Sequence, residues 1–189
     1  MSQVDESRIR EIVRRVVGQS LGIGVAELKV EMVAAKVQAG KTVAIGADHG
    51  GYEMKEALKQ ELVELGYTVS DVGTHSKEAV DYPDFALAVA LQVSGGKAWR
   101  GVVIDGAGIG SCMAANKVPG VRAAMAYDHA SAINSREHND ANLLTLGAGL
   151  TGLILAKQVL KIWLATEFGG GRHAKRVDKI IQIEKQFLK

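Results

Sequence analysis

Short apolar runs alternate with helical patterns along most of this chain, and no other feature constrains its fold as strongly. The segments between the runs repeat apolar residues at helical spacing, as Met54, Leu58 and Leu62 do within residues 51–66. Strands that alternate with helices form a parallel sheet covered by helices on both faces. We therefore predict an α/β domain with a five-stranded parallel sheet between two helical layers. Its strands are expected at residues 42–47, 67–73, 101–105, 121–127 and 142–148.

Composition limits the class of protein. The chain has 189 residues, of which 47% are hydrophobic and 23% charged, as expected for one globular domain with an appendage. A net charge of +2 gives no support to a nucleic-acid or membrane-surface partner. No apolar run approaches the roughly 20 residues of a membrane span, and the first residues mix acids with arginines, unlike a secretory signal. The single cysteine, Cys112, excludes an intramolecular disulfide, and we expect a soluble cytoplasmic protein.

Residues 1–40 form a separate piece in this interpretation, ahead of a domain at residues 41–189. Ile9, Ile12 and Val16 recur at helical spacing with charged residues between them, and Gly18 interrupts the pattern. A short amphipathic helix on such a tether can dock in a partner's groove. It can also fold back on its own domain or form a dimer contact, so the pattern alone leaves these readings open.

Chemically active side chains follow several of the predicted strands. In an open parallel sheet, ligands bind at the carboxyl ends of strands, where loops lead into helix N-termini. We expect one edge of the sheet to gather polar residues from these segments and from the C-terminal segment: Asp48, His49, His75, Asp81, Tyr82, Asp105, Asp128, His129, Arg136, His138, Asn139, Arg172 and Arg176.

Each of these groups also has a purely structural reading. Asp48 can cap a turn, and His138 can belong to the polar end of a helix. Arg172 and Arg176 are four residues apart, which predicts one helical face, and three glycines precede them. Two arginines beside glycines, with few local acids, favour a phosphate ligand over a solvated helix face.

Residues 104–117 predict the end of a strand, a glycine loop and a short helix. Gly106, Gly108 and Ser111, with Asp128 further along, mimic a dinucleotide fingerprint. The helix that follows is too short for that fingerprint, and its third small residue is a serine, so nicotinamide binding is the weaker hypothesis. The favoured one is a nest whose backbone N–H groups face a small anion or an oxyanion.

Five motifs, in order, resemble those of one family: VAIGADHGGYEMKEAL, DYPDFA, GAGIGSCMAANKVPGVRAA, SREHNDANLLTLGA and GGGRHAKRV. They are similar to the type B ribose-5-phosphate isomerases, which include the galactose-6-phosphate isomerase subunits, and the resemblance runs from about Lys41 to Gln186. It implies a Rossmann-like α/β/α sandwich that interconverts an aldose and a ketose phosphate through a cis-enediolate. It also implies a homodimer or homotetramer with active sites shared between subunits, and no metal or nucleotide cofactor.

The resemblance assigns roles to particular residues. Asp48 and His49 would contact the sugar, and His138 would help to open its ring. Arg172 and Arg176 would hold the phosphate. The enediolate would be held by Asn139 and by the amides of Gly106, Ala107, Gly108, Ile109 and Gly110.

This sequence departs from the family pattern at four positions. Many members have a cysteine base where Asp105 stands, and a second subgroup has a glutamate where Ser111 stands. A threonine common in the loop is Ala107 here, and an arginine often found after the last strand is Gly149. A carboxylate can serve as the base, so we predict that Asp105 moves the proton between C1 and C2 of the sugar. The departures leave open a tetrose or galactose 6-phosphate as the substrate, and a subunit that binds a sugar phosphate without catalysis.

Residues 1–40 are not usual in the family core. Their helix and tether resemble the encapsulation peptides of enzymes housed in bacterial microcompartments, which implies shell proteins as partners through residues 1–20. Packing on the chain's own domain is the alternative. A scaffold protein whose function lies in this helix is the least favoured hypothesis, because it leaves Asp48, His138 and Arg176 without a role.

Overall fold

The computed structural model describes residues 40–188, so the predicted N-terminal helix and tether lie outside the described residues. A five-stranded sheet has the order β2-β1-β3-β5-β4, and every neighbouring pair is parallel. The predicted parallel sheet is therefore confirmed. Its strands are β1 (Thr42–Ala47), β2 (Thr68–Asp71), β3 (Arg100–Asp105), β4 (Ala123–Met125) and β5 (Leu143–Gly147).

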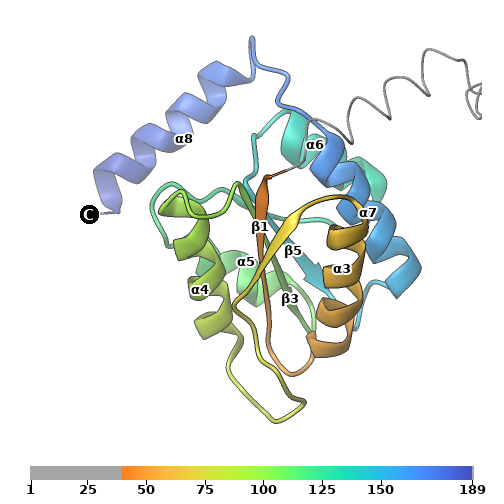
Figure 1. The fold of residues 1–189 in the computed structure, drawn as a ribbon. Coiled ribbons are helices and arrows are strands. Elements are labelled where there is room, and N and C mark those ends of the chain that lie inside the picture. The colour runs from red at the N-terminus through yellow and green to blue at the C-terminus, as the bar shows by residue number, and fades with distance from the viewer. Residues whose placement is uncertain (1–39, 189) are drawn as a thin grey trace, which may run out of the picture. The chain divides into compact units, whose positions relative to one another are not determined.

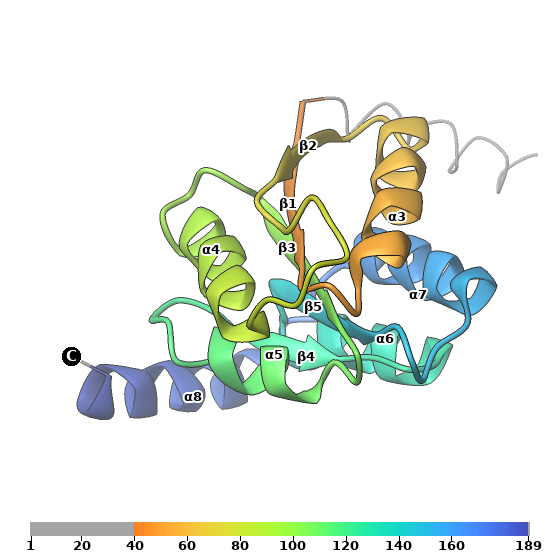
Figure 2. The same ribbon diagram turned by 90° about the horizontal axis from the view of Figure 1, so that it is seen from below.

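Helices cover both faces of the sheet (Figure 1, Figure 2). Buried residues of α3, α6 and α7 pack on one face, and those of α4 and α5 pack on the other. The Rossmann-like three-layer α/β/α sandwich is confirmed. The helices are α3 (Tyr52–Glu64), α4 (Tyr82–Ser94), α5 (Ile109–Ala115), α6 (His129–Glu137), α7 (Leu153–Ala165) and α8 (Ala174–Phe187).

The core is built on strands that are buried on both sides. In β1, Val43 and Ile45 belong to the cluster that includes α3 and α7, while Ala44 belongs to the cluster with α4. Small residues let α4 approach the sheet closely, since a Cβ atom on Gly101 would lie 2.6 Å from Val89 Cγ1. Near-continuous apolar runs are typical of strands covered on both faces.

The direction of the helices decides which residues reach which edge of the sheet. All strands are parallel, so they end at one edge, called here the carboxyl edge, and start at the opposite amino edge. Helix α6 leaves the carboxyl edge after β4 and returns to the start of β5. Helix α7 also returns to the amino edge, where the Arg100 guanidinium at the start of β3 donates to the carbonyls of Trp163 (2.9 Å) and Leu164 (2.8 Å). Segments that follow α6 or α7 therefore lie at the amino edge.

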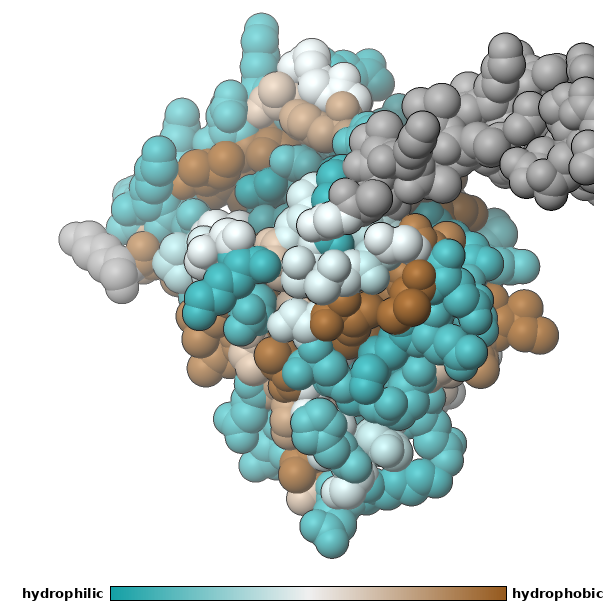
Figure 3. Space-filling model, viewed as in Figure 1, coloured by the Kyte–Doolittle hydropathy of each residue, from teal (hydrophilic) through white to brown (hydrophobic). Residues whose placement is uncertain are grey.

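Helix α8 packs less closely than the other long helices. Val177 is its buried residue, while Ile180, Ile183 and Phe187 are exposed. Apolar side chains gather along this helix in the space-filling view (Figure 3). An exposed apolar stripe of this kind is suited to contact another surface. Within residues 40–188, no helix is long and apolar enough to cross a membrane.

Candidate active site

Asp105 ends β3 at the carboxyl edge, and its carboxylate is surrounded by hydrogen-bond donors. Oδ1 accepts from the backbone N–H groups of Ala107 (2.8 Å) and Gly108. Oδ2 accepts from the backbone N–H of Ser111 (3.0 Å) and from its hydroxyl (2.5 Å). The residue is only 4% exposed. An ionised carboxylate has about four acceptor positions, so these donors occupy the whole group.

The glycine loop therefore already holds an anion, which is the chain's own carboxylate. The loop geometry depends on Gly108, whose φ is +79° and whose Cβ would lie 2.9 Å from the Leu146 backbone. Of the amides expected to hold the enediolate, those of Ala107 and Gly108 are engaged by Asp105.

Asp48 and His49 follow β1, which is the neighbour of β3 in the sheet. The Asp48 side chain is buried at 7% exposure, and its Oδ1 accepts from the backbone N–H of Gly51 at 3.0 Å, so it does cap this turn. His49 is exposed, and its Nδ1 lies 3.1 Å from the Val80 carbonyl oxygen. The glycine after His49 faces the Asp105 loop, because a Cβ on Gly50 would lie 3.6 Å from the Gly106 nitrogen. The structure thus brings Asp48, His49 and Asp105 to one edge, as predicted.

Tyr82 is a further residue at this edge to which the sequence assigned no role. It begins α4, and its ring lies directly on the glycine loop, since a Cβ on Gly110 would be 2.5 Å from the ring. Its side chain remains 39% exposed. Its place before Pro83, at the start of a helix on the carboxyl edge, was the available signal.

His138, Asn139, Arg172 and Arg176 do not join this group, so the prediction that all candidates meet at one edge is wrong. His138 caps the C-terminus of α6. Two residues on, the Asp140 carboxylate accepts a hydrogen bond at 2.8 Å from Arg122, which precedes β4, so this segment is at the amino edge. The two arginines follow α7 and lie at the amino edge as well. The prediction failed because a helix after a parallel strand carries its last residues back across the sheet. In Figure 1 the loop after β1 is at the bottom and the start of α8 is at the top.

A second cluster forms at the amino edge around two stacked histidines. The rings of His138 and His173 are parallel within 3°, with centroids 4.1 Å apart. Asn134 Nδ2 lies 2.8 Å from His138 Nδ1, and Arg172 Nε lies 3.4 Å from His173 Nε2. Desolvation, followed by the charges of His138, Arg172 and Arg176, lowers the pKa of His173. A cluster in which cations repel one another is suited to bind an anion such as a phosphate.

The two arginines do not share a helical face as predicted. Helix α8 begins at Ala174, so Arg172 precedes the helix and Arg176 sits on its first turn. Both side chains are exposed. They remain close in sequence to His173.

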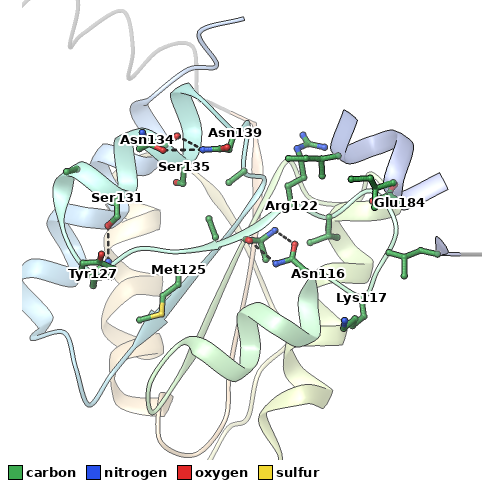
Figure 4. A pocket seen from close by; sticks show the side chains of 18 of the residues that line it. Asn116, Lys117, Arg122, Met125, Tyr127, Ser131, Asn134, Ser135, Asn139 and Glu184 are labelled. Atoms are coloured by element: carbon green, nitrogen blue, oxygen red, sulfur yellow. Dashed lines mark hydrogen bonds between the residues drawn. The ribbon is translucent and has the colours of Figure 1, made fainter. Parts of the chain in front are cut away.

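A groove of about 950 Å³ lies between α8 and the surface formed by the outermost strand, β4, and helix α6 (Figure 4). Ile180, Ile183 and Phe187 line it from α8, and Asn139 lines it from the end of α6. Asn139 Nδ2 lies 3.2 Å from Asn134 Oδ1, so this amide is turned towards its own helix. The groove runs along β4 and α6, from Arg122 and Asn139 at the amino edge to Tyr127 and Asp128 at the carboxyl edge, and its lining does not include the Asp105 loop.

Residues 40–188 contain no group of three or more histidine, cysteine, aspartate or glutamate side chains placed to hold a metal ion. Burial raises the pKa of the Cys112 thiol, whose Sγ lies 3.5 Å from the Ala123 carbonyl oxygen. Burial therefore disfavours the thiolate form of Cys112.

The chain is similar to known proteins over most of its length. Ribose-5-phosphate isomerase B of Escherichia coli strain K12 is 44% identical over 146 residues, which are 77% of this chain and 98% of that protein. D-erythrulose-4-phosphate isomerase of Pectobacterium atrosepticum is 40% identical over 146 residues, which are 77% of this chain and 96% of that protein. The solved ribose-5-phosphate isomerase B of Clostridium thermocellum is 53% identical with a TM-score of 0.76, covering 77% of this chain and 99% of that one.

The fold and these relatives place the chain in the sugar-phosphate isomerase class of enzymes. The sequence model described as Ribose/Galactose Isomerase matches residues 43–180, well over half of the chain. The chain belongs to this family. The resemblance found in its motifs is confirmed.

Proposed function

We propose that this protein is an aldose–ketose isomerase that converts ribose 5-phosphate into ribulose 5-phosphate. The observation that carries the proposal is its 44% and 53% identity to two ribose-5-phosphate isomerases B over almost their full lengths. The reaction needs ring opening, a base, donors for an oxyanion and an anchor for the phosphate. His138 would open the ring, Asp105 would be the base, and Arg172 and Arg176 would hold the phosphate.

The isomerisation moves one proton between neighbouring carbons. Asp105 takes the proton from C2 of the open-chain aldose, the C2–H electron pair forms the C1–C2 double bond, and the C1 carbonyl oxygen becomes an oxyanion. A proton then passes from O2 to O1, a carbonyl forms at C2, and Asp105 returns its proton to C1. Asp48 and His49, at the same edge as Asp105, orient the sugar hydroxyls.

The active site is shared between two copies of the chain in this proposal. Asp105 lies at the carboxyl edge and His138 at the amino edge of one chain. A strand of six residues such as β1 or β3 spans about 20 Å, which is longer than a five-carbon sugar phosphate. A second copy can bring its amino edge to the first copy's carboxyl edge, so that both groups reach one substrate.

The groove beside α8 supports an assembly of this kind. Ile180, Ile183 and Phe187 form an apolar stripe that its own chain leaves exposed, and a second copy that covers it would form a homodimer or homotetramer. Light scattering coupled to size-exclusion chromatography checks this: the wild type should elute as an oligomer, and Ile183→Glu should dissociate it. Lys179→Glu, on the exposed surface of the same helix, is the charge-changing control. A monomeric wild type with full activity would contradict the shared site.

The activity itself is tested by proton exchange at C2 across sugar phosphates of four, five and six carbons. We expect the fastest exchange and turnover with ribose 5-phosphate, without added metal, and loss of both in Asp105→Asn. Exchange with no member of the panel would refute the isomerase assignment. Binding without exchange would instead indicate a subunit that has lost catalysis.

A four-carbon or six-carbon substrate is the second candidate. The relative from Pectobacterium atrosepticum is named for a four-carbon sugar phosphate and is 40% identical, and the matching family includes galactose isomerases. Gly149 stands where the family often has an arginine, which changes the charge next to the glycine loop. The same panel of substrates decides between these candidates by their kcat/KM values.

The N-terminal extension is proposed to act as an encapsulation peptide that directs the enzyme from the cytoplasm into a bacterial microcompartment. The apolar spacing of residues 9–17 supports this, since it suits docking in a groove of a shell protein. Deletion of residues 1–20 should leave activity intact and abolish co-purification with shell proteins. Shell association that survives the deletion would refute the targeting role.

A further inference from the structure

The donors around the Asp105 carboxylate are of two kinds. Three are backbone N–H groups, from Ala107, Gly108 and Ser111, and the fourth is the Ser111 hydroxyl. The backbone donors are fixed, because the loop packs so closely that a Cβ on Gly147 would lie 2.5 Å from the Ala107 carbonyl. The hydroxyl can turn about one single bond without any movement of the backbone. Ser111 is thus the adjustable partner of this carboxylate.

A base has to carry its proton for part of the reaction cycle. When Asp105 is protonated, its carboxyl gains an O–H group. In three of the four positions around the carboxyl this O–H would point at a backbone N–H, so that two hydrogen-bond donors would face each other. In the fourth position the Ser111 hydroxyl can turn and accept, because a hydroxyl is both donor and acceptor. The proton of the Ser111 hydroxyl then needs another acceptor. A serine in a helix commonly donates to the backbone carbonyl four residues earlier, which here is that of Ala107.

We propose that Ser111 is a positioning residue for the base of this isomerase: its hydroxyl donates to the Asp105 carboxylate before proton transfer and accepts from the carboxylic acid afterwards. The inference rests on the proposed function, since it gives the base of that reaction a partner. The substrate proton moves to the position on Asp105 Oδ2 that the Ser111 hydroxyl leaves as it turns, and the electron pair of the C2–H bond stays with the enediolate. The serine keeps its own proton throughout, so no further acid or base is required.

The surroundings favour this pairing over a water-mediated one. Ser111 is fully buried and Asp105 is 4% exposed, so the hydroxyl that contacts the carboxylate is shielded from solvent. The titratable groups on the elements packed around Asp105 include Asp48 and His49 after β1, Asp81, Tyr82 and Asp84 at the start of α4, and Cys112 on α5, whereas β5 contributes none.

The test compares Ser111→Ala with Ser111→Thr through the pH dependence of kcat/KM. A bond from a donor to a carboxylate is stronger than one to the neutral acid, so its loss favours the protonated form. We expect the midpoint of the acidic limb to rise by about one pH unit in Ser111→Ala and to stay near the wild-type value in Ser111→Thr, which keeps the hydroxyl. A uniform loss of activity in Ser111→Ala, with the midpoint unchanged, would overturn the proposal and leave Ser111 a packing residue.

A second readout works without turnover. Carbon-13 NMR of the labelled Asp105 carboxyl, assigned with Asp105→Asn, follows its protonation in the free enzyme, and thermal unfolding shows that each variant is folded. If the wild type isomerises no sugar phosphate, the proposed function fails, and the NMR midpoint still decides whether Ser111 partners Asp105. A shift in the NMR midpoint without a matching shift in kcat/KM of an active enzyme would show that Asp105 is not the base, and it would overturn the inference.

Discussion

Replacement of Arg100 by methionine should destabilise the domain strongly, although Arg100 is remote from the glycine loop. The side chain is 2% exposed and lies at the start of β3. It donates to the carbonyls of Trp163, Leu164 and Thr166 at the end of α7, and its guanidinium carbon lies 4.0 Å from the centre of the Trp99 ring. Methionine fills much of the same volume but supplies no donor.

The magnitude follows from the carbonyls left without a donor. Thr166 keeps a bond of 3.2 Å from Arg136 Nε, so two buried carbonyls, of Trp163 and Leu164, lose their side-chain donor, at about 1–2 kcal/mol each. The cation–π contact with Trp99 adds about 1 kcal/mol. Burying the charged guanidinium also costs free energy, and this burial lowers the pKa of Arg100 to about 10. Replacing the charged side chain removes that cost, which offsets part of the lost stability. We expect the free energy of unfolding to fall by about 2–4 kcal/mol.

Urea denaturation followed by circular dichroism measures this change, and the melting temperature should fall by roughly 5–15 °C. Lys97→Met is the matched control, because it removes one positive charge from an exposed position and should change stability by less than about 0.5 kcal/mol. An Arg100→Met protein as stable as the control would refute the reasoning. It would mean that the free energy spent on burying the guanidinium equals the free energy that its hydrogen bonds contribute to stability.

Three further changes have defined outcomes. Burial opposes ionisation of Asp71, but hydrogen bonds from Lys55 and neighbouring donors outweigh it and lower its pKa, so its contribution to stability is present at neutral pH and is lost as the pH falls below the usual aspartate range. Asp71→Asn should therefore flatten the acid side of a plot of unfolding free energy against pH. Gly108→Ala forces a side chain into a left-handed backbone and should cost about 1–3 kcal/mol by urea denaturation. Arg176→Ala should raise KM for the sugar phosphate about tenfold or more in steady-state assays, with a smaller change in kcat.

The layers and strands of the fold could be predicted because they depend on local apolar patterns. Residues 42–47 were predicted as a strand, and β1 has these bounds. The fourth strand was predicted at residues 121–127 but spans Ala123–Met125. At its start, the Arg122 N–H donates to the side chain of Asn142 in place of a strand partner. Such a side-chain contact across 20 residues leaves no signal in local periodicity.

The candidate site was predicted less completely, for two physical reasons. Residues at the end of a strand or directly after it, such as Asp105 and Asp48, were placed at the correct edge because strand ends fix their position. His138 and Arg176 come after a further helix, and their placement depends on the direction of that helix across the sheet. The hydrogen bonds from Ser111 to Asp105 depend on how tightly the loop turns, which the glycines allow but do not specify.

The central claim is that an isomerase site forms where the carboxyl edge of one chain meets the amino edge of another. Asp105→Asn and His138→Gln should each be inactive alone, because every site in either homo-oligomer lacks one group. When the two variants are unfolded, mixed in equal amounts and refolded together, about a quarter of wild-type turnover of ribose 5-phosphate should return, since one site in each mixed dimer has both residues intact. A mixture that stays inactive, while its chains demonstrably form mixed oligomers, would contradict the account.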